Sequence, residues 1–338
     1  MTTAARRPAA PGRSGGTTGP ALRRLALRAL ELLVVLFIAS IGVFSLVVLM
    51  PGDPAVDILG AGRAPSEYAA LRTELGLDQP LATRYFDWLG GALTGDLGRS
   101  VVPPRSDVAG RVMSALPVSL EIAVLGLLIA LLVAVPLAMW SAYREGSVAD
   151  RIIGAGTFGV LSVPSFLAGL LLILLLVDSG GWFPRSAWVR IGDGDLLGNL
   201  HHAFLPALTV ALAELAMFTR VLRGDLIVTL REDYILAARA KGMNPLRILF
   251  TDALRPSSFS LVTLLGLSLG RLIGATVVVE YLFSLPGMGT LIVNAANQGD
   301  YPMVQGAVLT VAVIYVVINA GIDLSYGYLD PRTRRVHA

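Results

Sequence analysis

Six long apolar segments constrain the fold of this chain more than any other feature. Each holds about 17–25 residues, which is enough for a helix to cross the hydrocarbon core of a bilayer. Hydrophobic residues make up 54% of the 338 positions and charged residues only 15%, unlike a soluble domain. The sequence therefore predicts an all-α membrane protein with six transmembrane helices. The segments are 29–50, 115–139, 152–177, 204–222, 258–280 and 303–324.

The distribution of basic residues predicts the orientation of these segments. With the N-terminus in the cytoplasm, 18 Lys and Arg residues lie inside and 8 outside, and Arg271 lies within the fifth segment. Because cytoplasmic loops carry the excess of basic residues, we predict that both termini are cytoplasmic. The expected regions are a disordered tail (1–22), the first transmembrane helix (23–50), an extracellular region (51–113), a five-helix core (114–325) and a cytoplasmic C-terminal tail (326–338).

Composition excludes several kinds of chemistry. The chain has no cysteine, so disulfides, thiolate metal sites and cysteine nucleophiles are ruled out. His201 and His202 are adjacent and lack a third ligand nearby, so we expect no metal site. The single lysine, Lys241, does not stand in a P-loop pattern, and any ATP must bind to another subunit. The sequence shows no combination of serine, histidine and carboxylate residues that would suggest a hydrolase. The arginines concentrate in a few loops and do not indicate a surface for binding nucleic acid. We expect a non-catalytic subunit.

A polar segment, EDYILAARAKGMNP at 232–245, separates the fourth and fifth apolar segments. It predicts two short helices. The first ends at Gly242, the residue best able to adopt the left-handed conformation after a helix. The second begins with Asn244 as its N-cap and Pro245 in its first turn. On the predicted topology this helix-turn-helix is cytoplasmic.

The same segment resembles the EAA loop of ABC importer permeases, through which an ATPase subunit acts on the membrane domain. The resemblance lies in Ala237 and Ala238, with a glycine four residues further on. Leu236 stands where the general motif has glutamate, and the remaining form is typical of the peptide-permease branch. We expect the coupling loop to span 223–257. The residues expected to contact the ATPase are Tyr234, Ile235, Ala237, Ala238, Arg239, Lys241, Gly242, Met243 and Asn244.

The resemblance extends over residues 23–333, to the first membrane subunit of the dipeptide/oligopeptide (and nickel) permease family. Eight short segments typical of the family occur in order, although each alone is weak evidence. They are PGDP at 51–54, ELGLD at 74–78, GDLGRS at 95–100, SVPSF at 162–166, LPAL at 205–208, FSLPGMG at 283–289, DYP at 300–302 and DPR at 330–332. Arg271, the long N-terminal tail and residues 182–195 depart from the family pattern.

This resemblance implies a fold, partners and a location. The fold would be a type I ABC importer transmembrane domain with an extracellular insertion after the first helix. The partners would be a homologous second permease subunit, two ATPase subunits that bind ATP and Mg, an extracytoplasmic peptide-binding protein and membrane lipid. The chain itself would hold no cofactor and would reside in the bacterial inner or plasma membrane.

The cargo is left open between two alternatives within the family and one outside it. The first is import of di- and oligopeptides. The second is import of a nickel chelate, glutathione or haem-like cargo by the same kind of permease. A more distant alternative is an ion-coupled secondary transporter, which would commonly show inverted repeats and buried coupling acids.

Two features of the membrane segments are candidates for the translocation path. Gly266, Gly270 and Gly274 form a stripe of small residues that permits close helix packing, and packing within one subunit is the interpretation we favour. Glu214 and Arg271 lie about half-way along the fourth and fifth segments. Because a charge there is costly, we expect them to pair, to face an aqueous path, or each to face the partner subunit.

The extracellular region offers candidates for contact with a binding protein. Asp53, Asp96 and Asp300 all lie outside on the predicted topology, although they could equally be solvated turn residues. Residues 81–92 place Leu, Tyr and Trp side chains at helical spacing. This helix would lie along the outer membrane face or pack on its own loop.

Overall fold

The computed structural model describes residues 18–49, 53–74, 76–184 and 188–329 of the chain. Within these ranges the chain is mostly helical and contains no strand, apart from one isolated bridge between Arg99 and Asp107. The predicted all-α class is confirmed. Most of the predicted tails, namely 1–17 and 330–338, lies outside the described residues. Residues 18–22, which we assigned to the N-terminal tail, form the first turn of a helix.

Five described helices are long and apolar enough to cross a membrane, and a bent pair would make a sixth span. Most of these helices are longer than the predicted apolar segments at both ends, because the helix continues into the polar residues that flank each segment. They are α1 (Thr18–Leu49), α5 (Val108–Tyr143), α8 (Leu196–Thr229), α11 (Leu254–Leu282) and α13 (Tyr301–Leu329).

The third apolar segment is broken rather than continuous. It comprises α6 (Val148–Ser162) and α7 (Ser165–Leu172), which a π-helical turn extends over Ile173–Asp178. The two halves meet at an angle of 102°. Pro164 causes the break, because the residue before a proline avoids the helical region, and Val163 is extended at φ −95° and ψ 122°. The expectation of one uninterrupted helix over 152–177 is therefore wrong.

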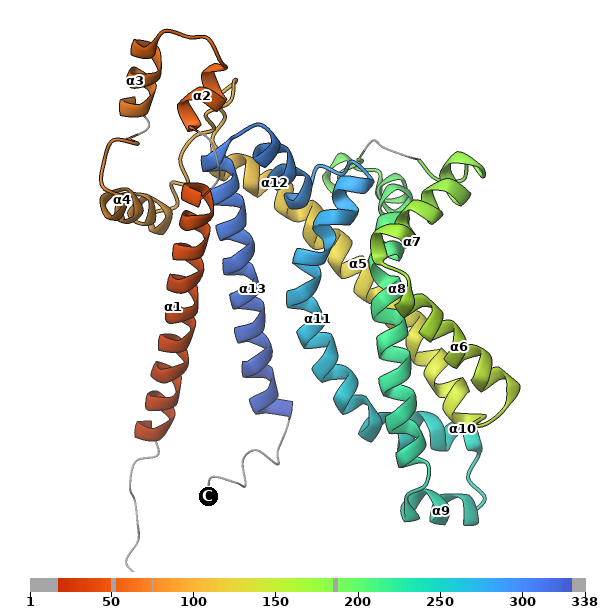
Figure 1. Cartoon of the computed structure of the whole chain (residues 1–338). Coiled ribbons are helices and arrows are strands. Elements are labelled where there is room, and N and C mark those ends of the chain that lie inside the picture. Colours follow the sequence, from red (N-terminus) through yellow and green to blue (C-terminus); the bar gives the residue numbers. More distant parts are fainter. Residues whose placement is uncertain (1–17, 50–52, 75, 185–187, 330–338) are drawn as a thin grey trace, which may run out of the picture.

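Helices α5 and α8 form the centre of the molecule. A Cβ on Gly126 of α5 would lie 3.1 Å from the carbonyl oxygen of Ala207 in α8, so the two backbones approach closely there. Ala130, Ala134 and Ala138 continue this small-residue face and are fully buried. With 36 residues, α5 is about 54 Å long, well beyond the bilayer core of about 30 Å. It runs obliquely behind α8 (Figure 1).

Three short helices form the outer region after the first span: α2 (Pro54–Leu59), α3 (Pro65–Glu74) and α4 (Leu81–Leu93). The predicted helix over 81–92 is confirmed as α4. It packs on α1 rather than only on its own loop, because the Tyr85 hydroxyl lies 2.7 Å from Ser40 Oγ. The Tyr85 ring also meets Phe44 edge-on at 5.4 Å between centroids.

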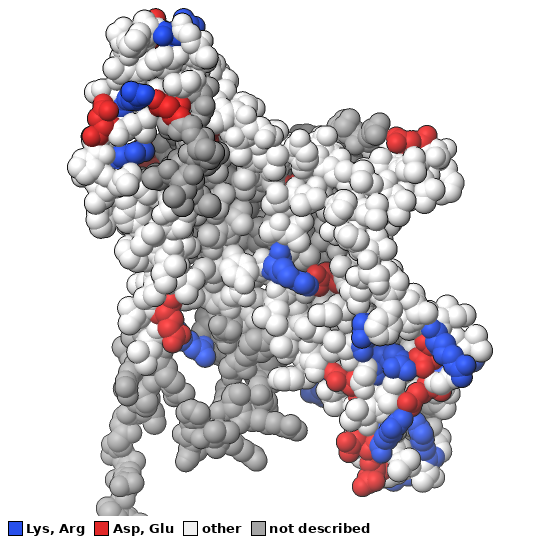
Figure 2. Space-filling model, in the orientation of Figure 1, with Lys and Arg blue, Asp and Glu red and all other residues white. Residues whose placement is uncertain are grey.

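The two ends of the molecule carry the remaining short elements (Figure 1). The outer end holds a 3-10 turn (Ile191–Asp193) and α12 (Met288–Asn297). The opposite end holds α9 (Asp233–Ala240), α10 (Pro245–Arg247) and a π-helical segment (Ile248–Ala253). Figure 2 shows charged side chains gathered at these two ends and a largely uncharged belt between them, as expected for a membrane span.

Candidate functional site: a cytoplasmic loop joined to a charged pair in the membrane

The loop between α8 and α11 has the predicted helix-turn-helix form. It comprises residues 230–253, because α8 and α11 extend further than the expected limits of 223–257. Gly242 follows α9 with φ +73°, in the left-handed region that favours glycine. The Asn244 side chain accepts a hydrogen bond of 2.9 Å from the Leu246 amide and caps α10.

One face of α9 anchors this loop to the body of the protein. Ile235 is fully buried and belongs to the main core together with Leu226 and Ile248. Ala238 and Met243 are half-buried and pack against the same core. We had placed Ile235 on the contact surface, but its side chain is covered by the chain itself. It therefore supports the loop from within.

The opposite face of α9 is open to solvent. Tyr234 and Leu236 are about half exposed, at 48% and 51%. The sequence analysis had treated Leu236 only as a departure from the family motif, yet it contributes a large apolar side chain to this face. The other expected contact residues that are exposed are Ala237, Arg239, Lys241, Gly242 and Asn244.

Tyr234 also ties α9 to the segment that follows it. Its hydroxyl donates a hydrogen bond of 3.3 Å to the carbonyl oxygen of Asp252. Partial burial and the neighbouring charges of Glu232 and Asp252 raise the pKa of Tyr234 above its usual value. The hydroxyl therefore stays protonated and remains a donor at physiological pH.

The loop continues directly into a membrane helix. α10, the π-helical segment and α11 follow one another without an intervening turn from Pro245 to Leu282. The loop and α11 therefore share one continuous helical stretch. This helix carries Arg271, which lies about two-thirds of the way along the helical stretch.

An ion pair joins the C-terminal ends of α5 and α8 to the start of α6. Arg223 donates from both Nε and an Nη nitrogen to the two Asp150 oxygens, at 2.7 and 2.8 Å. Ser141 Oγ lies 2.5 Å from the same carboxylate. The sequence analysis missed this cluster. The available signal was an aspartate in the first turn of a helix, facing a loop rich in arginine.

The two charges expected in mid-membrane form a pair between α8 and α11. An Arg271 Nη nitrogen donates to Glu214 Oε1 at 2.6 Å, and Ser268 Oγ donates to Glu214 Oε2 at 2.6 Å. The Glu214 side chain is 4% exposed and that of Arg271 is 61% exposed. Of the alternatives considered, pairing is confirmed, and Arg271 faces outward from the bundle.

The glycine stripe on α11 packs against α13 at two of its three positions. A Cβ on Gly266 would lie 2.6 Å from Ile322, and one on Gly270 would lie 2.8 Å from the Asn319 side chain. Nothing lies within 4 Å of a Cβ built on Gly274. Packing within the subunit, the favoured interpretation, thus accounts for Gly266 and Gly270.

The three outer aspartates have different surroundings. Asp53 caps α2 by accepting from the Ala55 amide at 3.0 Å, and the Arg72 guanidinium holds its pKa below the usual range. Asp96 accepts from the Gly98 amide at 2.8 Å within a turn. Asp300 is buried and accepts from Ser100. Asp300 therefore has no free face for a docking partner.

A second carboxylate besides Glu214 is deeply buried. Glu280, near the end of α11, is fully buried. Its Oε2 accepts from the Gly289 amide at 2.7 Å and so holds α12 against α11. A carboxylate at the edge of an apolar segment, followed by a glycine-rich turn, was the available signal.

The two adjacent histidines each contact a backbone carbonyl. His201 Nε2 lies 2.9 Å from the Trp182 oxygen and His202 Nδ1 lies 2.8 Å from the Gly198 oxygen. Across the described residues, no group of three or more His, Cys, Asp or Glu side chains could hold a metal ion.

Known protein families match nearly the whole chain. Residues 134–335 match the family model described as binding-protein-dependent transport system inner membrane component. Residues 21–121 match the model of the N-terminal part of such membrane components. Together they include the outer region, the loop between α8 and α11 and the paired charges.

Curated relatives agree with this assignment. The chain is 36% identical to a putative peptide transport system permease protein of Brucella abortus, over 91% of this chain and 97% of the relative. It is 35% identical to the oligopeptide transport system permease protein AppB of Bacillus subtilis, over 83% and 90%. It is 32% identical to the di/tripeptide transport system permease protein DppB of Pseudomonas aeruginosa, over 92% and 97%. The chain therefore belongs to the family of binding-protein-dependent transport system inner membrane components and is a multi-pass membrane protein.

Proposed function

We propose that this chain is a permease subunit of an ATP-driven importer of di- and oligopeptides. It would form half of the translocation path together with a homologous second permease subunit. Two ATPase subunits would bind ATP and Mg on the cytoplasmic side, and an extracytoplasmic binding protein would deliver the peptide. The printed names of the relatives support the peptide cargo.

One observation carries the coupling part of this proposal. The exposed face of α9 lies on a loop that is anchored by Ile235 and that continues as helix through α10 into α11. An ATPase that pushes on Tyr234 and Leu236 would therefore displace α11 as a body. Because α11 carries the partner of Glu214, the displacement would reach the middle of the membrane.

The proposed transport cycle follows from this connection. Closure of the ATPase dimer on ATP moves residues 233–247, and the attached helices rock between inward-open and outward-open states. The Arg223–Asp150 pair keeps the ends of α5, α6 and α8 together during this motion. The binding protein then releases its peptide into the cavity between the two permease subunits.

Purification from the native membrane tests the composition of the complex. A tagged chain should bring down two ATPase subunits and a second permease. Because the chain has no cysteine, an Ala237→Cys variant offers one defined position for cross-linking, and it should cross-link to an ATPase. Cysteine at Ala61, which is exposed in the outer region, is the matched control and should not.

Uptake by the reconstituted complex tests the cargo. Vesicles should accumulate labelled peptides only when ATP and the binding protein are both present. Uptake of a nickel chelate, glutathione or haem instead of peptides would transfer the cargo assignment to the second alternative. A chain that purifies alone and transports in response to an ion gradient would overturn the importer assignment.

A further inference from the structure

Two adjoining pockets open at the outer end of α5. The first has a volume of about 500 Å³ and lies between α5, α12 and the loop before α5. The second, about 880 Å³, lies along α5 beside the segment that precedes α8. Ser114 and Arg190 line both pockets. We call the combined space the outer groove. Each of the two pockets has the size of a site for a small organic ligand.

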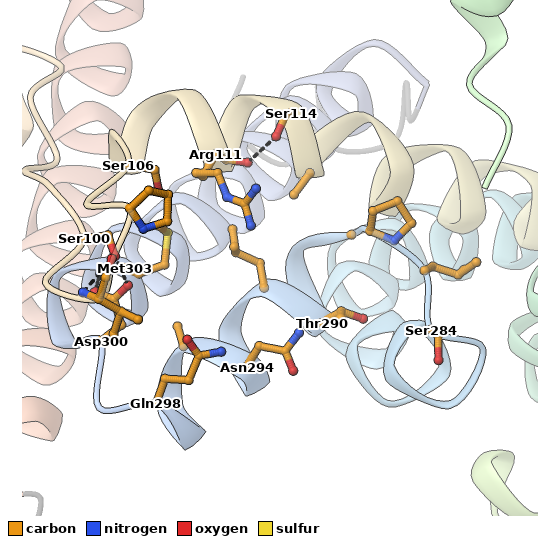
Figure 3. Close-up of a pocket in the computed structure, with 18 of the residues that line it drawn as sticks. Ser100, Ser106, Arg111, Ser114, Ser284, Thr290, Asn294, Gln298, Asp300 and Met303 are labelled. Carbon is orange, nitrogen blue, oxygen red and sulfur yellow. Dashed lines mark hydrogen bonds between the residues drawn. The ribbon is translucent and has the colours of Figure 1, made fainter. Parts of the chain in front are cut away.

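The first pocket is cationic and rich in hydrogen-bonding groups. Figure 3 shows the Arg111 side chain projecting from α5 into the pocket toward α12, which contributes Thr290 and Asn294, and Gln298 follows at the end of this helix. Among the residues that the structure describes, no carboxylate pairs with the guanidinium of Arg111 or Arg190. Asp300 also lines this pocket, but its carboxylate is already held by Ser100. Arg111 is thus available to an incoming anion.

The second pocket is apolar with a single acid. Most of its wall is apolar, and the residues that supply it are Met113, Pro117, Val118, Leu120, Val124, Leu125, Trp188 and Ile191. Glu121 also lines it, and one carboxylate oxygen of Glu121 is buried without a hydrogen-bond partner in the described part of the chain. No arginine or lysine there lies within ion-pair distance of Glu121. A negative charge in such surroundings needs a cation or a proton.

These charges complement a molecule with an anionic and a cationic end. Arg111 and Glu121 are ten residues apart on one helix, or about 15 Å along its axis. An extended peptide spans about 3.3–3.6 Å per residue, so about four residues cover this distance. Asparagine and glutamine side chains can hydrogen-bond to a peptide backbone of any sequence. The apolar wall between the two ends suits varied side chains.

On the basis of the proposed peptide transport, we propose that the outer groove receives the free peptide as it leaves the binding protein. The C-terminal carboxylate binds Arg111, with Arg190 beside it, and the N-terminal ammonium binds Glu121. The occupant is a short zwitterionic peptide of about four residues. The permease would thereby read both peptide termini independently of the binding protein.

The test uses the full reconstituted importer with a saturating amount of its binding protein. Uptake of a tetrapeptide with free termini is compared with its C-terminal amide and its N-acetyl derivative. Arg111→Gln should reduce the ratio of free acid to amide uptake by about tenfold, because a charge-assisted bond is lost. It should leave the ratio of free amine to N-acetyl uptake unchanged. Glu121→Gln should have the reverse effect.

The controls have the same charge changes elsewhere in the outer region. Arg63, just before α3, and Glu67, within α3, form an exposed pair 3.9 Å apart. Arg63→Gln and Glu67→Gln should therefore retain both wild-type uptake ratios. The binding protein is the same in every assay, so a changed ratio belongs to the permease. Arg111→Lys, which keeps the charge, should retain most of the preference for the free acid.

Each other outcome has a defined meaning. Wild-type ratios in both groove variants would overturn the groove while leaving the proposed function intact. An equal loss of uptake for all peptides, together with a need for more binding protein, would show that Arg111 contacts the binding protein. That result would also overturn the proposed peptide site in the outer groove. If a variant fails to assemble, the test is binding of a labelled tetrapeptide to the wild-type complex, with the unlabelled free acid or the C-terminal amide as competitor. Equal competition by the two would refute the proposed peptide site in the outer groove. No uptake of any peptide by the wild type would refute the proposed function itself.

Discussion

At the residue scale, Glu214 and Arg271 form a charged pair between two long apolar helices. A single charge at mid-membrane costs about 2.5–3.5 kcal/mol on insertion scales. Glu214 is relieved of this cost by two donors, Arg271 and Ser268, while Arg271 remains more than half exposed. The pair therefore places a cation on the surface of the bundle, part-way along an apolar helix.

Glutamine substitutions measure how strongly these two residues interact. Arg271→Gln and Glu214→Gln should each destabilise the purified complex by about 1–3 kcal/mol, because each leaves a polar partner unsatisfied. The loss of stability in the double variant should be about 1–2 kcal/mol smaller than the sum of the two single losses, since the effects of contacting residues are not additive. Thermal unfolding of the four proteins checks this. Strict additivity would show that the pair contributes nothing.

The glycine stripe offers a second test with its own internal control. Gly266→Ala and Gly270→Ala insert a methyl group that collides with α13, and overpacking of this kind costs about 1–3 kcal/mol. Gly274→Ala meets open space and should be neutral or slightly stabilising, because alanine is the better helix former. Melting temperatures of the three variants check the order. Equal effects at all three positions would contradict the observed α11–α13 packing.

At the scale of elements, the sequence was informative where local chemistry decides the structure. Gly242, Asn244 and Pro245 predicted the end of α9 and the start of α10, because caps depend on residues within one turn. The break at Pro164 carried a local signal too, yet the apolar run across it concealed the bend. The burial of Ile235 could not be predicted, since it depends on core residues brought by α8 and the π-helical segment.

The turn between α9 and α10 determines how the loop meets α11, and Gly242 permits that turn. A side chain there must adopt a left-handed backbone, which costs about 1–2 kcal/mol for most residues. Gly242→Asp should leave the chain in the membrane and assembled but abolish peptide uptake, with ATP hydrolysis no longer linked to transport. Gly242→Asn should retain much of the uptake, because asparagine and aspartate both tolerate this conformation but only aspartate adds a negative charge to the exposed turn. Uptake and ATP hydrolysis are measured on the same vesicles. Normal, ATP-linked uptake by the Gly242→Asp variant would refute the coupling role.

At the scale of the whole molecule, hydropathy predicted six spans, and the described residues contain five long apolar helices and one bent pair. The direction of the spans, inferred from arginine placement, stays a prediction. Hydropathy and arginine placement did not predict which helices touch. The α5–α8 core, the Arg223–Asp150 pair and the outer groove join residues far apart in sequence, and a single sequence contains no direct record of such contacts. The partner of Glu214 was proposed from depth alone, because both residues lie near the middle of their segments.

The orientation of the molecule in the membrane decides whether α9 can meet an ATPase and whether the outer groove can meet a binding protein. The absence of cysteine allows a direct measurement with single-cysteine variants. Ala61→Cys in the outer region should react with a membrane-impermeant maleimide on intact spheroplasts. Ala237→Cys should react only after the membrane is opened. Because the excess of arginine favours α9 on the cytoplasmic side, the reverse pattern would invert the protein and remove both proposed contacts together.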